Sequence, residues 1–224
     1  MVGLSCFFDF SDGLLARALK VNSEIGKQLD SLADMVSFGV VPGVLMYMLL
    51  EICFIRLFCT RYSMSINEAL AIAVESRNNS GISYLAFLIP VLSAIRLAKF
   101  NLDTRQTNSF IGLPTPANTI FISSLALILS RDSTPQTIKE IILHPYFLIT
   151  LSVISSFLLI APLPLFALKF KNFSWADNKV RYIFLALAAT LLIIFRFAGI
   201  PLIIVLYIVL SIINNIISRS KTQQ

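Results

Sequence analysis

Residues 9–34 read DFSDGLLARALKVNSEIGKQLDSLAD, and this stretch decides how the rest of the chain is organised. It carries four aspartates, Asp9, Asp12, Asp30 and Asp34, in the spacing D-x2-D-G-x2-A-R-x8-G-x3-D-x3-D. The sequence around it is strongly apolar. Ionised side chains at membrane depth are costly, so acids grouped in such a chain indicate a functional site.

The composition indicates a membrane protein. Of the 224 residues 57% are hydrophobic and 13% are charged, whereas soluble domains are about 25% charged. Several apolar runs approach the length of about 20 residues with which a helix crosses a bilayer. We therefore expect an all-α fold: one polytopic domain over residues 1–224 with about six to seven transmembrane helices. The net charge of +6 is better explained by topology and anionic lipid than by nucleic acid.

Breaks in the apolar runs give the expected helices. A polar turn is predicted at 21–28, and the segment 182–217 is too long for one crossing. Arg196 and the Gly199-Ile200-Pro201 sequence predict a tight turn that divides it into two helices. A pair of glycines, Gly39 and Gly43, is spaced for close helix packing. The expected helices cover residues 1–20, 29–58, 82–100, 115–130, 146–168 and the two halves of 182–217.

The distribution of basic residues predicts the orientation. If the loop between the first two helices faces the cytoplasm, 12 of the 18 Lys and Arg residues lie on that side. This excess agrees with the positive-inside rule. The four aspartates and the basic 169–181 loop then share the cytoplasmic face, where the loop is expected to contact anionic lipid headgroups.

The spacing of the aspartates predicts a metal site. Asp9 and Asp12 are three residues apart and Asp30 and Asp34 are four apart, so each pair lies on one helical face. Two antiparallel helices with these faces opposed bring four carboxylates together, and their mutual repulsion is relieved by cations. Oxygen donors without His or Cys favour Mg²⁺ or Mn²⁺. Such ions usually also bind a substrate phosphate, which predicts metal-assisted phosphoryl transfer at the membrane surface.

The pattern resembles the signature of the CDP-alcohol phosphatidyltransferase family at every fixed position. The resemblance implies that Asp9, Asp12, Asp30 and Asp34 bind two divalent metal ions, with Asp34 also the general base. It further implies that the CDP part of a CDP-diacylglycerol donor is bound by small or basic residues, namely Gly13, Ala16, Arg17 and Gly26. A homodimer in a bacterial inner membrane, with its active site facing the cytoplasm, is the assembly and location that the resemblance implies.

Further segments resemble the branch of this family that makes phosphatidylserine. They are residues 30–43 (DSLADMVSFGVVPG), 96–101 (RLAKFN) and 110–117 (FIGLPTPA). We therefore expect L-serine as the acceptor, with phosphatidylserine and CMP as products. The carboxylate of serine needs a cation, for which Arg96, Lys99 and Arg105 are the candidates. Its ammonium needs an acceptor, for which the candidates are Asn101, Asp103 or a backbone carbonyl near residues 112–114.

Other acceptors and other classes stay open. Glycerol 3-phosphate or an inositol compound would need more cationic contacts for its additional phosphate. A proton- or metal-coupled transporter would also bury acids, and a non-catalytic scaffold is a third class. Eight residues before Asp9 span about 12 Å, less than half of the hydrocarbon core. Because the family carries a further helix there, we expect this chain to be a fragment whose upstream sequence encodes that helix.

Overall fold

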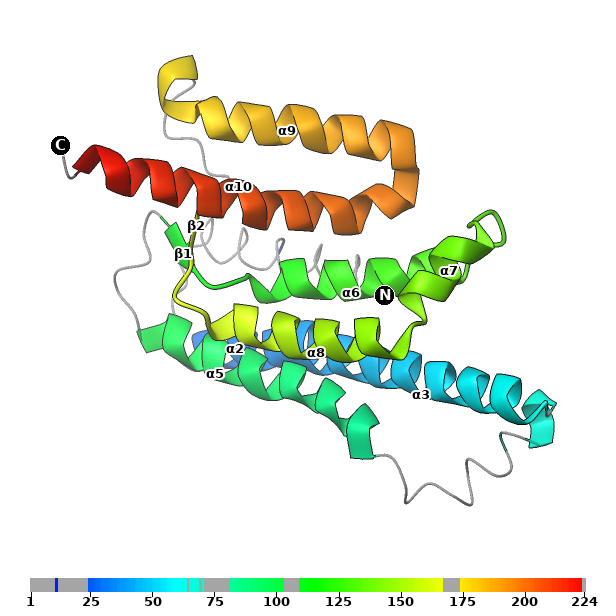
Figure 1. The fold of residues 1–224 in the computed structure, drawn as a ribbon. Helices are drawn as coiled ribbons and strands as arrows, with labels where there is room; N and C mark the ends of the chain where they lie inside the picture. Colours follow the sequence, from blue (N-terminus) through cyan, green and yellow to red (C-terminus); the bar gives the residue numbers. More distant parts are fainter. Residues whose placement is uncertain are drawn as a thin grey trace.

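The computed structural model describes residues 11, 24–63, 65–68, 70, 81–102, 109–166 and 174–222. These residues are almost entirely helical, which confirms the all-α prediction (Figure 1). The elements, in chain order, are α2 (Glu24–Met35), η1 (Val36–Val40), α3 (Val41–Tyr62), η2 (Gly81–Phe87), α5 (Leu88–Leu102), β1 (Ser109–Ile111), α6 (Thr115–Leu129), α7 (Gln136–Ile142), α8 (Pro145–Ile160), β2 (Pro164–Phe166), α9 (Trp175–Phe195), η3 (Arg196–Ala198) and α10 (Gly199–Thr222).

The membrane spans in the described residues are fewer than expected. Three helical stretches are long and apolar enough to cross a membrane, Glu24–Tyr62, Gly81–Leu102 and Asn178–Ile217, and a fourth results if α7 and α8, bent by 55°, count as one span. The prediction of six to seven is too high for this part of the chain. One reason is α6, whose 15 residues extend only about 22 Å.

The first long helix begins earlier than predicted. The expected turn at 21–28 is wrong for its second half, because α2 starts at Glu24 and runs through η1 into α3. Glu24 lies in the first turn, where a carboxylate interacts favourably with the helix dipole. The helix therefore carries both Asp30 and Asp34, and Asp34 lies two residues before η1 begins.

The predicted close packing at Gly39 and Gly43 is confirmed, and the partner is α5. A Cβ atom added at Gly39 would lie 3.1 Å from Ser93 Cβ, and one added at Gly43 would lie 2.6 Å from Pro90 Cδ. Only glycine permits this approach. Next to it is the main core, formed by Met46, Leu49, Leu50, Cys53, Ala86, Ile89, Ile122 and Leu148.

A two-stranded antiparallel ribbon, absent from the prediction, joins distant parts of the chain. Strands β1 and β2 pair with Phe110 opposite Leu165. Gly112, which follows β1, has a φ of +78°, and a side chain there would collide with the carbonyl of Leu159. Helix α10 is fixed to β2 by two hydrogen bonds, from Tyr207 Oη to the Phe166 carbonyl at 2.9 Å and from Asn215 Nδ2 to the Pro164 carbonyl.

Helices α9 and α10 form an antiparallel hairpin, as the sequence predicted (Figure 1). The chain reverses at η3, where Arg196 takes a φ of 51°. The guanidinium of Arg131, in the loop that follows α6, lies 4.2 Å from the centroid of the Phe197 ring. This cation–π contact attaches the turn of the hairpin to the rest of the bundle.

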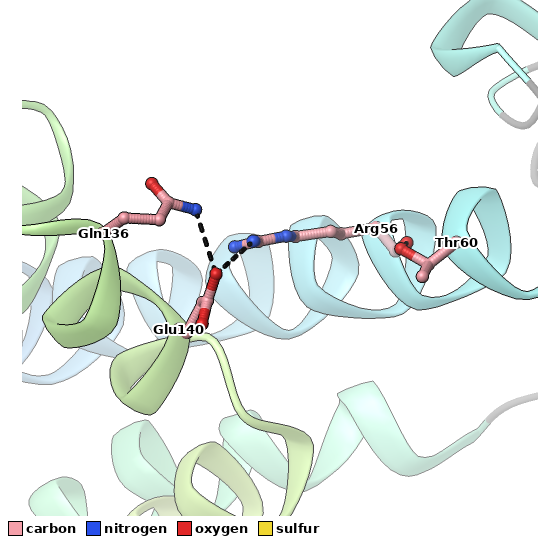
Figure 2. A network of polar contacts seen from close by, with 4 residues as sticks. All are labelled: Arg56, Thr60, Gln136 and Glu140. Carbon is pink, nitrogen blue, oxygen red and sulfur yellow. Dashed lines mark hydrogen bonds and ion pairs between the residues drawn. The ribbon is translucent and has the colours of Figure 1, made fainter.

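A polar network fixes α7 against α3 near the end of α3 (Figure 2). Arg56 Nη2 lies 3.6 Å from Glu140 Oε1, and Gln136 Nε2 donates to the same oxygen at 3.3 Å. On the same helix, Thr60 Oγ1 donates to the Arg56 carbonyl at 2.9 Å. Arg56 is about 33 Å along the helix from Asp34, so this network lies far from Asp30 and Asp34.

Candidate functional site

Two of the four aspartates lie on one face of α2. Asp30 is exposed and Asp34 is half-buried. Gly26, Asp30 and Asp34 follow one another at intervals of four residues, so they form a row along the helix. The shared face of Asp30 and Asp34 agrees with the prediction from the sequence.

Several predicted site residues lie outside the described residues. They are Asp9, Asp12, Gly13, Ala16, Arg17 and Arg105. Within the described ranges no group of three or more His, Cys, Asp or Glu side chains gathers as a metal site would require. The structure thus contributes two of the four predicted metal ligands, and the roles of all four stay predictions.

Arg96, one of the predicted serine contacts, interacts with a residue of this face. It lies on α5, is only 8% exposed, and interacts electrostatically with Asp34. Its Nη1 donates to Thr115 Oγ1 on α6 at 3.5 Å, while its Nε has no hydrogen-bond partner among the described residues. A buried cation with a free donor next to a carboxylate is suited to binding an anionic group.

The other two described candidates on α5 differ from each other. Asn101 Nδ2 donates to Ser31 Oγ on α2 at 2.8 Å, so this side chain joins the helix of the aspartates to the helix of Arg96. Lys99 is exposed. The structure therefore brings Asn101 and Arg96 to the helix that carries Asp30 and Asp34. Their contacts with serine stay predictions.

Thr119 was missed by the sequence analysis. This buried residue of α6 donates its hydroxyl to the Phe38 carbonyl of η1 at 3.0 Å, and the same hydroxyl lies 2.9 Å from the Thr115 carbonyl. A signal was present in the sequence. Pro42 has no N–H and would leave the Phe38 carbonyl without its usual helical donor, so another donor was to be expected.

An apolar cavity lies beside these polar groups. It has a volume of about 550 Å³ and is lined by residues of α6, α9 and α10 and by Pro114 before α6, with Ala117, Phe184 and Tyr207 among them. Tyr207 also interacts electrostatically with Arg96. Tyr207 is therefore shared between the lining of the cavity and the electrostatic environment of Arg96.

The described donors suit a hard divalent cation. Asp30 and Asp34 supply carboxylate oxygens one helical turn apart, and oxygen donors are the preferred ligands of Mg²⁺ and Mn²⁺. The site defined by this fold is an acidic helical face, close to a buried arginine and an apolar cavity, in a helical membrane protein.

Comparison with known proteins identifies the family. The sequence profile of the CDP-alcohol phosphatidyltransferase family matches residues 1–160. The chain belongs to this family, which confirms the resemblance drawn from the aspartate spacing.

Curated relatives share about 30% identity with the chain. It is 32% identical to a CDP-diacylglycerol–serine O-phosphatidyltransferase of Bacillus subtilis (strain 168) over 131 residues, which are 58% of this chain and 57% of that protein. It is 32% identical to a CDP-diacylglycerol–serine O-phosphatidyltransferase of Helicobacter pylori (strain J99) over 130 residues, 57% of this chain and 45% of that protein. An archaetidylserine synthase of Methanothermobacter thermautotrophicus is 31% identical over 127 residues, 55% of this chain and 43% of that protein. The chain spans about half the length of these relatives.

Proposed function

We propose that the protein transfers the phosphatidyl group of CDP-diacylglycerol to L-serine, giving phosphatidylserine and CMP. The observation that carries this proposal is the aspartate face of α2, which lies against α5 with Arg96 buried beside Asp34. Family membership supports the reaction class, and the serine-using relatives support the acceptor.

The aspartates are proposed to hold two divalent cations, Mg²⁺ or Mn²⁺. Asp30 and Asp34 would supply ligands from α2, and Asp9 and Asp12 would supply the others. When bound, the metals would offset the charge of the diphosphate and of the departing CMP. In the same proposal Gly13, Ala16, Arg17 and Gly26 line the site of the CDP group.

Asp34 is proposed to accept the proton of the serine hydroxyl. The hydroxyl oxygen then attacks the phosphorus that carries the diacylglycerol, and the bond from this phosphorus to the oxygen of CMP breaks. Arg96 interacts electrostatically with Asp34, so the positive charge of the guanidinium offsets the negative charge of this carboxylate. Its unpaired Nε is available for the carboxylate of serine.

The apolar cavity is proposed to receive one acyl chain of the donor. Its lining is apolar apart from the Tyr207 side chain, whose hydroxyl is already bonded to Phe166. A lipid in this cavity would have its headgroup near the buried Arg96. The acceptor site is proposed to face the cytoplasm of a bacterial inner membrane in a homodimeric protein, as the excess of basic residues and the family resemblance suggest.

The acceptor is tested with a panel of alcohols. Membranes containing the chain are supplied with CDP-diacylglycerol, Mg²⁺ or Mn²⁺, and serine, glycerol 3-phosphate, inositol or inositol phosphate, and CMP release is measured. We expect release with serine. Release with another acceptor but not with serine would show that the proposed acceptor is wrong. Metal-dependent ion or proton flux without CMP release would support a transporter.

A further inference from the structure

The helix that carries Asp30 and Asp34 changes its hydrogen bonding immediately after Asp34. Residues Val36–Val40 form a π-helical turn, in which the Val41 N–H donates to the Val36 carbonyl five residues earlier. Such a turn holds about one residue more than an α-helical turn. The residues before it are therefore rotated by about 100° relative to their position in an uninterrupted α-helix.

The carbonyl of Phe38 explains what stabilises this turn. In an α-helix it would accept from the N–H of residue 42, but Pro42 has no N–H. Phe38 is fully buried, so water cannot replace the donor. The hydroxyl of Thr119, itself fully buried on α6, donates to this carbonyl at 3.0 Å in a hydrogen bond that it shares with the Thr115 carbonyl.

The rotation of α2 determines what Asp34 faces. Ser31 and Asp34 are three residues apart and share a helical face. Ser31 accepts a hydrogen bond from Asn101 of α5, and Asp34 interacts with Arg96 of the same helix. If α2 rotated to the phase of a regular α-helix, this face would turn away from α5.

We propose, building on the proposed function, that Thr119 is a positioning residue for the metal-binding carboxylates. Its side chain acts through the Phe38 carbonyl: it holds the π-helical turn open and thereby keeps Asp30 and Asp34 directed toward the acceptor side of the site. The Thr115 carbonyl, which shares the same hydroxyl, keeps Thr119 in the required rotamer.

The test replaces Thr119 by Val, which has nearly the same shape but no hydroxyl, and by Ser, which keeps the hydroxyl. Thr190→Val is the matched control, because Thr190 also donates to a carbonyl four residues earlier but lies exposed on α9. Mn²⁺ affinity is measured by electron paramagnetic resonance on purified protein, together with CMP release and thermal unfolding. We expect Thr119→Val to weaken Mn²⁺ binding and to slow CMP release, each about tenfold or more. Thr119→Ser and Thr190→Val should stay within about twofold.

Unchanged Mn²⁺ affinity in folded Thr119→Val would overturn the proposal. If the valine variant does not fold, Thr119→Ala replaces it. If neither variant folds while Thr119→Ser does, the hydroxyl serves stability alone, and this result would also overturn the proposal. A wild-type chain that binds Mn²⁺ without releasing CMP would refute the proposed function, yet the Mn²⁺ affinities would still decide the role of Thr119. Absence of Mn²⁺ binding by the wild type would overturn the positioning role together with the metal site.

Discussion

Replacing Gly43 by alanine places a methyl group against the ring of Pro90. The added Cβ would lie 2.6 Å from Pro90 Cδ and 3.1 Å from its Cγ. Carbon atoms pack best at about 3.5–4.0 Å, so the two helices must separate locally by about 1 Å. Neither partner can yield by a simple rotation, because the proline ring is rigid and the glycine lies on a helix.

The expected magnitude follows from this displacement. Overpacking a close helix contact costs about 1–3 kcal/mol in the free energy of unfolding. The shift also moves α5, on which Arg96 and Asn101 lie one to three turns after Pro90. Since a misplacement of about 1 Å can lower a catalytic rate about 100-fold, we expect Gly43→Ala to reduce serine-dependent CMP release by about 10- to 100-fold.

The assay is CMP release from CDP-diacylglycerol and serine in detergent, with thermal unfolding recorded on the same samples. Gly81→Ala is the control, since a Cβ atom at Gly81 meets nothing within 4 Å. Activity of Gly43→Ala within about twofold of Gly81→Ala would show that the spacing of α3 and α5 does not set the geometry of the site.

Three other changes test separate parts of the account. Arg96→Met should lower kcat/KM for serine by about 100-fold or more, because a positioned cation is lost. Equal activity in the folded variant would remove Arg96 from the site. Arg56→Ala should lower the free energy of unfolding by less than about 1 kcal/mol, because the side chains of Arg56 and Glu140 are 41% and 58% exposed. CMP release should be unchanged, and a large loss of activity would link the far end of α3 to the site. Chelation by EDTA should abolish CMP release, and Mg²⁺ or Mn²⁺ should restore it; full activity in EDTA would exclude the metal site.

The sequence predicted those features that depend on local spacing. The i, i+4 interval placed Asp30 and Asp34 on one face, the glycine pair predicted a close helix contact at Gly43, and the break before Pro201 predicted the α9–α10 hairpin. Each of these follows from helical periodicity or from the chemistry of Gly and Pro. The identity of the helix that packs on Gly43 did not follow, because it depends on tertiary contacts.

The features that were missed involve partners distant in the sequence. Strands β1 and β2 are short, and the pairing of Phe110 with Leu165 spans 55 residues, so no local pattern indicates it. The hydrogen bond from Thr119 to Phe38 spans 81 residues. Pro42 indicated that a carbonyl needed a donor, but which residue supplies it depends on how α6 packs against η1.

The central claim is that Asp34 belongs to the catalytic centre of a serine phosphatidyltransferase. The most direct measurement is the rate of CMP release upon addition of serine to purified protein with CDP-diacylglycerol and Mn²⁺, for the wild type, Asp34→Asn and the loop control Asp132→Asn. We predict release by the wild type and by Asp132→Asn, and a rate reduced by about 1,000-fold or more in Asp34→Asn, which has lost the proposed base and metal ligand. Wild-type rates in Asp34→Asn would contradict the account.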